Sequence, residues 1–300
     1  MRGYPARAFS FPITGLPFAA RHVSFLSIER GRTMLAMAIL MAMAQVAAPP
    51  AVVPADGRSE KQRLADASFF GAMIYAFDRA AWVSSDSLME IVPRDQLTGV
   101  GGYVIEPVEK DTLRATYFKG AAADARAFFV ADVRGGKVVR HAILPAPVPL
   151  TPPQMILARA REIATQEAAA KRYRPCTAAP FNTVVLPSVS GGPVTVYLLS
   201  PQVSHTSYMM GGNYRVAIAP DGRIVDSRAF NTSCLDLKLP EKQKRGDAVV
   251  GLFVNHLLDP VPTEIHVFAS YSVLQPIFVL TPDKRTWQVR GRDISILAPR

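Results

Sequence analysis

The chain is poor in cysteine and lacks several motifs that mark common enzymes. It has no G-x-S-x-G nucleophile motif, no H-E-x-x-H zinc motif and no P-loop, and no G-x-G-x-x-G opens a helix. Gly99-Val100-Gly101-Gly102 precedes a predicted strand instead of lying between a strand and a helix. These absences exclude the best-marked hydrolases, metalloproteases and nucleotide-binding enzymes, and no cofactor is predicted.

Acidic residues are the minority charge. The chain has 34 Lys and Arg against 24 Asp and Glu, a formal net charge of +10. Without residues 1–44 there remain 29 basic and 23 acidic residues, a net charge of +6. Apart from one cluster at 238–245 the basic residues are scattered, and no basic stripe with interleaved aromatics indicates nucleic-acid binding. A solvated basic surface is therefore favoured over a polyanion-binding face.

The N-terminal part contains the clearest targeting signal. Residues 34–44 are an apolar run of eleven residues, preceded by Arg30 and Arg32 and followed by small residues. A membrane-spanning helix needs about 20 apolar residues, whereas a basic flank, a short apolar run and an A-x-A-like end are typical of a secretory signal peptide. We therefore predict that 1–48 is a signal segment, cleaved after Ala44 or Ala47, and that the mature protein is periplasmic or secreted, without a stable membrane span.

Two features of 1–48 leave alternatives open. Its first 29 residues form an unusually long leader, which a later translation start near Leu26 would explain. An uncleaved membrane anchor is the second alternative. A transit peptide is the third, since residues 1–28 contain only basic charges.

The two cysteines, Cys176 and Cys234, both lie in the predicted mature part. In an oxidising compartment an even pair indicates one disulfide bond. Two separate buried thiols are the alternative. Their spacing excludes a C-x-x-C redox motif.

The predicted fold class is α+β, with two or three helices packed on antiparallel meanders. After a 49–58 linker, a capping box at Ser59 and Gln62 starts a helix, and short strands follow at 99–106, 112–118, 126–133 and 137–144. A proline-rich break at 145–149 ends this first unit, 59–146. The second unit, 151–237, repeats the plan, with a capping box at Thr151 and strands at 182–186, 194–200, 213–219 and 223–230.

The repetition extends to individual residues. The segment 130–139 aligns with 216–225 at an offset of 86 residues, which indicates a duplicated helix-plus-four-strand unit. Independent convergence on a common hairpin sequence is the alternative. A third segment, 246–300, is predicted to contain a helix at 247–258, a strand at 263–272 and a terminal meander, packed on the second unit.

The strongest polar cluster is in this third segment. If 263–272 is a strand, Glu264 and His266 lie on the same face, and His256 at the end of the predicted helix is one turn away. Two imidazoles and a carboxylate would suit a divalent metal, with His205 as a further ligand. The alternative is a histidine pair with a structural role. Weaker candidates are a copper site at His205, Met209 and Met210, and a hydrolase using Ser207 or Ser270.

These observations lead to two hypotheses and one structural alternative. The first is an exported, non-catalytic protein that binds a protein or peptide of the cell envelope. The second is a metal-dependent enzyme or metal carrier using His256, Glu264 and His266. A purely structural domain held at the envelope by an uncleaved N-terminal segment is the third.

Overall fold

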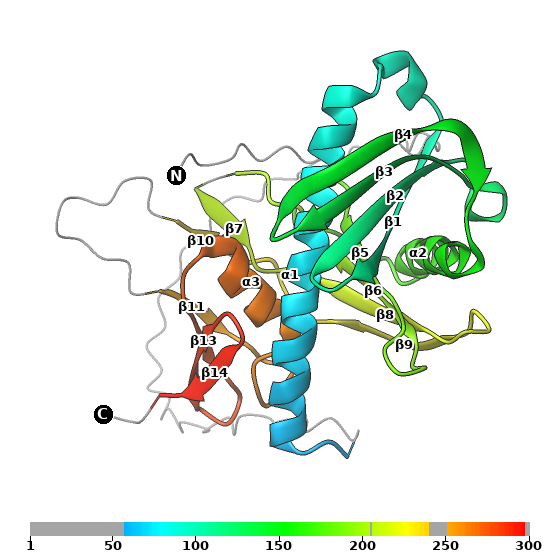
Figure 1. Cartoon of the computed structure of the whole chain (residues 1–300). Helices are drawn as coiled ribbons and strands as arrows, with labels where there is room; N and C mark the ends of the chain where they lie inside the picture. Colours follow the sequence, from blue (N-terminus) through cyan, green and yellow to red (C-terminus); the bar gives the residue numbers. More distant parts are fainter. Residues whose placement is uncertain (1–56, 205, 240–250, 298–300) are drawn as a thin grey trace, which may run out of the picture. The chain divides into compact units, whose positions relative to one another are not determined.

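The computed structural model describes residues 57–204, 206–239 and 251–297. This part of the chain contains three α-helices and four β-sheets, which confirms the predicted α+β class (Figure 1). The predicted signal segment, 1–48, lies outside the described residues. Within them, no helix combines the length and apolar character needed to cross a membrane.

The first unit is a long helix followed by a four-stranded meander. Helix α1 begins at the predicted capping box, in which the Ser59 hydroxyl accepts from the Gln62 N–H and the Gln62 side chain accepts from the Ser59 N–H. The strands pair in chain order, each antiparallel to the next. The elements are α1 (Glu60–Ile91), β1 (Val100–Glu109), β2 (Thr112–Lys119), β3 (Arg126–Arg134) and β4 (Lys137–Pro149).

The prediction of a break at 145–149 is wrong, because β4 continues to Pro149. Proline lacks the N–H that a ladder needs, so it is confined largely to edge strands. β4 is the last strand of its sheet and pairs only with β3, so the prolines there need no second partner. The register of β4 is also irregular between Ile143 and Val148. Prolines and bulges at an edge discourage pairing with other chains.

The second unit has the same order of elements. Helix α2 (Pro152–Ala170) starts at the predicted capping box, Thr151 and Gln154. The strands β5 (Asn182–Leu186), β6 (Val194–Leu199), β8 (Tyr214–Ile218) and β9 (Ile224–Ala229) form an antiparallel sheet in chain order. The similar segments 130–139 and 216–225 form equivalent hairpins, β3–β4 and β8–β9. The sequence did not predict the small pair of β7 (Ser207–Met209) with β10 (Asp236–Lys238).

In the C-terminal segment the predicted helix and strand are exchanged. β11 (Leu252–Asn255) is a strand where a helix was predicted over 247–258, and α3 (Glu264–Val273) is a helix where a strand was predicted over 263–272. β11 pairs in parallel with β12 (Ile277–Leu280), with α3 as the crossover between them. The meander then ends as predicted, with β13 (Thr286–Arg290) and β14 (Asp293–Ile296).

Complete burial explains the error at α3. Its residues 264–270 are all buried, so the helix has no polar face from which a 3.6-residue period can be read. Its valines, isoleucine and aromatics also have high strand propensity. The remaining sequence signal was its capping box, in which His266 occupies the position usually held by Glu or Gln.

Two apolar cores lie on opposite faces of the sheets. Neighbouring residues on the same strand enter different cores: Ile105 packs in the core beside α1, whereas Val104 packs in the core beside α2. Val184 and Val185 divide in the same way on β5. The core beside α1 also contains the inner face of the C-terminal sheet, including Trp287. Both units and the C-terminal segment therefore contribute to the core beside α1.

Candidate functional site

The structure brings together two of the three predicted metal ligands. The rings of His256, which follows β11, and His266, in the first turn of α3, meet edge to face with centroids 4.6 Å apart. Glu264 instead accepts hydrogen bonds from Arg215 and Tyr197. The prediction that Glu264 and His266 share a face was wrong, because a spacing of two residues places side chains on different sides of a helix.

Both imidazoles are buried and have other partners. His256 Nε2 lies 2.9 Å from Asp259 Oδ2. His266 Nδ1 accepts from the Thr263 N–H at 3.0 Å, which places the proton of the neutral ring on Nε2. Burial and the nearby His256 lower the pKa of His266 well below its ordinary value, so the ring is neutral at pH 7. Among residues 57–204, 206–239 and 251–297, no three His, Cys, Asp or Glu side chains are grouped to hold a metal ion. His205 lies outside these ranges.

Ser270 and Met210, from the weaker hydrolase and copper candidates, both have contacts that stabilise the fold. The Ser270 hydroxyl donates to the Gln275 carbonyl and accepts from the Gly291 N–H. Met210 is fully buried in the apolar core. Neither residue contributes to a polar cluster.

Arg228 extends the histidine pair to the second sheet. Its Nη1 and Nη2 atoms donate to Asp259 Oδ1 and Oδ2 at 2.9 and 2.6 Å, a two-point ion pair with a buried carboxylate. Burial alone would raise the pKa of Asp259. The bonds from His256 and Arg228 outweigh it and hold the pKa below its usual range. The carboxylate therefore stays charged down to strongly acid pH.

Arg215 makes a parallel connection from β8 to α3. Its Nη1 donates to Glu264 Oε1 at 3.0 Å, and its Nε and Nη2 donate to Asp226 Oδ2. Tyr197 on β6 donates to the same Glu264 oxygen, and burial raises the pKa of this phenol, which stays protonated. Two arginines of the second sheet thus hold two carboxylates of the C-terminal segment.

The pairing register places these two arginines side by side. Arg215 and Arg228 occupy directly opposite positions on β8 and β9, and Tyr197 is next to Arg215 on β6. Like charges at opposite positions destabilise a sheet, so this arrangement depends on the surrounding carboxylates. The ring of Phe230 lies beneath both guanidinium groups. Its centroid is 5.9 Å from Arg215 Cζ and 4.9 Å from Arg228 Cζ. We call this group the arginine pair.

A recess of about 430 Å³, measured with its open mouth, lies over the arginine pair. α1, the arginine pair and the loop leading into α3 form its walls. It is lined by Arg58, Arg63, Asp66, Ala67, Phe70, Arg215, Arg228, Asp259, Val261, Pro262, Thr263 and Glu264. Asp259 and Glu264 are buried, whereas the side chains of Arg215 and Arg228 are 20% and 25% exposed. The recess therefore brings partly exposed guanidinium groups together with buried carboxylates.

Sequence reasoning missed this site because it treated the basic residues as a scattered surface. A signal was present in β9 and the residue after it, where Asp226, Arg228 and Phe230 alternate with Ser227 and Ala229. This period of two places the charged residues on one face of the strand. The charged residues on that face have partners in β8 and in the C-terminal segment.

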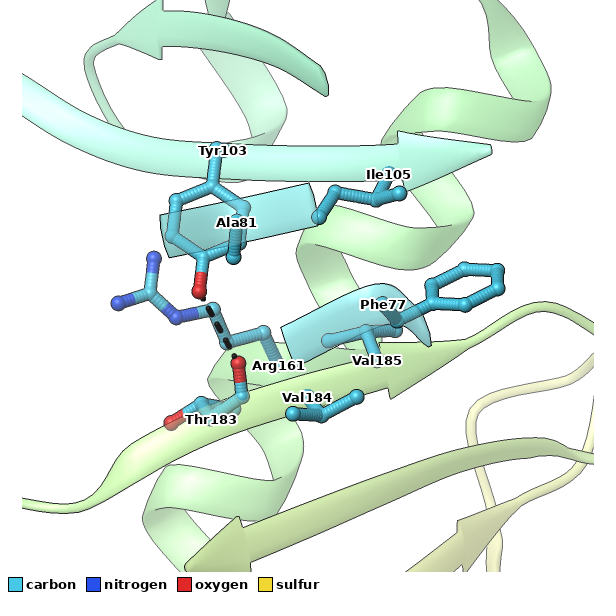
Figure 2. Close-up of a pocket in the computed structure, with 8 residues that line it drawn as sticks. All are labelled: Phe77, Ala81, Tyr103, Ile105, Arg161, Thr183, Val184 and Val185. Atoms are coloured by element: carbon cyan, nitrogen blue, oxygen red, sulfur yellow. Dashed lines mark hydrogen bonds between the residues drawn. The ribbon is translucent and has the colours of Figure 1, made fainter. Parts of the chain in front are cut away.

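A second hollow, of about 280 Å³, lies between β1 and β5 beneath α1 (Figure 2). The Tyr103 hydroxyl crosses it and donates to the Thr183 carbonyl at 3.3 Å. Burial raises the pKa of Tyr103 to about 12, so the phenol remains a donor. Phe77, Ala81, Ile105, Val184 and Val185 give the hollow a mainly apolar lining, with Arg161 near Tyr103 (Figure 2). The Tyr103–Thr183 hydrogen bond joins the two sheets across this hollow. Few polar groups line the hollow, so we do not expect it to bind a polar ligand.

The predicted disulfide between Cys176 and Cys234 is present, with Cα atoms 5.6 Å apart, a usual separation. Gly211 and Gly212 pack against it: a Cβ on Gly211 would lie 2.7 Å from Cys234 Cα, and one on Gly212 would lie 2.7 Å from the Cys176 nitrogen. Ser200 Oγ accepts from the Cys176 N–H and donates to the Gly211 carbonyl. This glycine pair therefore belongs to a packed support for the cross-link.

Comparisons of the chain with known protein families, curated proteins and solved structures found no match.

Proposed function

We propose that the mature chain is an exported binding protein of the cell envelope and not an enzyme. The observation that carries this proposal is the disulfide between Cys176 and Cys234. Disulfide bonds form and persist in oxidising compartments and are rare in the cytosol. Both cysteines of the chain are used in it, and the basic, apolar and small-residue order of 1–48 is typical of a secretory signal.

The recess over the arginine pair is where we place binding. Its guanidinium groups are held by carboxylates behind them and by Phe230 beneath them, so they need little reordering when a partner arrives. Concave sites with a few fixed polar groups are the usual form of a ligand site. A protein or peptide of the envelope is the expected partner.

Export is tested by expressing the full-length chain in a bacterium that exports proteins. Intact mass should show loss of 1–44 or 1–47, and thiol titration should find no reactive cysteine in the periplasmic fraction. The matched control is Leu40→Arg, which interrupts the apolar run and should leave unprocessed protein in the cytosol. Full-length protein with two reactive thiols in the cytosol would contradict export.

Binding is tested by capture from an envelope extract with the immobilised protein. The same component should be recovered by the natural sequence and by Arg140→Gln, which changes an exposed arginine of the first sheet. Arg63→Gln, on the recess wall, should lose it. Equal recovery by Arg63→Gln, or no recovery above background, would contradict binding at the recess.

A further inference from the structure

We propose that the recess binds an oxyanion, a carboxylate or a phosphate group, that is attached to a small apolar moiety. This inference rests on the proposed binding function and specifies its ligand chemistry.

The first support is the number of hydrogen-bond donors left on the arginine pair. Each guanidinium has five N–H groups. Three of those on Arg228 are used, two by Asp259 and one, from Nε, by the Ala229 carbonyl. Three of those on Arg215 are used by Asp226 and Glu264. Two N–H groups remain on Arg228 and no more than two on Arg215, whose guanidinium also interacts with the Tyr197 hydroxyl, and both guanidinium groups line the recess.

The second support is the position of these donors. Arg215 and Arg228 lie opposite each other on neighbouring strands, where Cβ atoms are about 5 Å apart. Two guanidinium groups at this spacing can both donate to the oxygens of one carboxylate or phosphate. Because buried Asp259 and Glu264 fix them from behind, the geometry exists before the ligand arrives.

The third support is where the charges of the site lie. Four guanidinium groups, from Arg58, Arg63, Arg215 and Arg228, line the recess with three carboxylates, and Asp226 adds a fourth carboxylate by accepting from Arg215. The two buried carboxylates lie behind the more exposed guanidinium groups of the arginine pair. The two buried carboxylates already accept from the arginine pair, so a cation would have to displace an arginine from each. The first turn of α3 also borders the recess through Thr263 and Glu264, and the partial positive charge of a helix N-terminus adds to the attraction for an anion.

The apolar part of the ligand follows from the remaining wall. Ala67 and Phe70 of α1, together with Val261 and Pro262, line one side of the recess. Much of the recess volume of about 430 Å³ is open to solvent, so the recess holds the oxyanion group and the apolar part of the ligand lies against this wall at the mouth. A chain-terminal carboxylate next to an apolar residue has this chemistry, and so does a phosphate next to a short alkyl group.

The test uses isothermal titration of the purified protein at low ionic strength with four probes: N-acetyl-leucine, its uncharged amide, inorganic phosphate and butyl phosphate. We expect N-acetyl-leucine or butyl phosphate to bind at least tenfold more tightly than the amide. Tighter binding of the first identifies a carboxylate ligand, and tighter binding of the second identifies a phosphate ligand. In Arg63→Gln and Arg58→Gln the affinity should fall at least fivefold, and in Arg140→Gln it should not change.

Equal binding of N-acetyl-leucine and its amide, with no binding of either phosphate, would overturn the proposal. So would unchanged affinity in both Arg58→Gln and Arg63→Gln, with a thermal melt confirming that each variant is folded. If no probe binds while capture from the envelope extract still depends on Arg63, the oxyanion inference fails and the proposed function stands.

Discussion

The two helix-plus-sheet units share an element order but differ in how their charged residues are used. On the first sheet, Asp132 accepts from Arg114 and Arg140, and all three belong to neighbouring strands of that sheet. On the second sheet, Arg215 and Arg228 reach carboxylates of the C-terminal segment. The buried carboxylate of the first sheet is satisfied within that sheet, whereas the arginine pair of the second sheet also depends on carboxylates of the C-terminal segment.

The two units also differ in how they contact the C-terminal segment. The first unit meets α3 through apolar packing at Gly71 of α1, where an added Cβ would lie 2.4 Å from Val267 Cβ. The second unit meets the C-terminal segment through the buried ion pairs of Arg215 and Arg228, and the disulfide cross-links the second unit internally. The ion pair of the first unit to this segment, Arg285–Glu60, is more exposed, so the joint of the first unit depends more on close packing. Four substitutions test this difference.

Removing the disulfide should have the largest effect. The cross-link closes a loop with a sequence separation of 58 residues, which is worth about 4 kcal/mol in the chain-entropy account. We expect the Cys176→Ser, Cys234→Ser double variant to lose about that much free energy of unfolding in urea. The natural sequence under reducing conditions is the matched comparison and should show a similar loss. Equal stability with and without the bond would show that the second unit is held by its other contacts.

Asp78→Asn should stabilise the protein at alkaline pH. Burial raises the pKa of Asp78, on α1, to about 6, although a hydrogen bond from the Asn182 amide partly opposes the shift. The folded state therefore binds a proton more tightly than the unfolded state, and stability is lost as pH rises from about 4 through 6. We expect a gain of up to about 3 kcal/mol at pH 8 and almost none below pH 4. A gain that does not vary with pH would contradict a buried, titrating carboxyl.

Gly71→Ala should destabilise the protein, although alanine favours helices more than glycine by about 1 kcal/mol. The new Cβ would also meet the Glu264 carbonyl at 2.7 Å, so α1 and α3 have to separate. Overpacking of this kind costs about 1 to 3 kcal/mol. Ala76→Gly, at an exposed position of the same helix, measures the propensity alone. If Gly71→Ala raised the thermal midpoint, the close packing of the two helices would be wrong.

Of the four substitutions, His266→Gln should have the smallest effect, a change in the pH dependence of stability. Because the folded-state pKa of His266 is lowered, the unfolded state binds its proton first, and stability is lost as pH falls below about 6.5. Asp78 opposes this loss between about pH 4 and 6, so the variant is compared directly with the natural sequence. We expect His266→Gln to gain about 1 kcal/mol relative to the natural sequence for each pH unit below about 6.5.

Glutamine keeps the acceptor that the capping box needs, so His266→Gln should fold normally at pH 7. His141→Gln, which changes an exposed residue of β4, is the control and should retain the natural slope. Parallel slopes for His266→Gln and the natural sequence would contradict titration of this ring.

The meanders were predictable because glycines and charged residues mark their turns and because their strands have exposed or partly exposed residues. The C-terminal exchange of helix and strand was not predictable in this way, because residues 264–270 of α3 are all buried. The pairing of Cys176 with Cys234 was predictable because the chain has only these two cysteines.

The recess was harder to predict than the disulfide. Arg215 and Arg228 are 13 residues apart in sequence, and their carboxylate partners Asp259 and Glu264 come from a segment whose secondary structure was assigned incorrectly. Only the two-residue period of β9 indicated that one face carries charges. The pairing of strands, which sequence alone does not reveal, placed the two arginines together.

The shared core beside α1 has a consequence for how the chain can be divided. Ile74 of α1 and Trp287 of β13 belong to the same buried cluster, so material from both ends of the described chain closes it. A fragment ending at Leu239 would lack α3 and the C-terminal sheet and would leave this surface of α1 open to water. During synthesis this face of α1 therefore stays open until the C-terminal segment is made, whereas the core beside α2 contains no residue of the described chain after Ile224 and can close earlier.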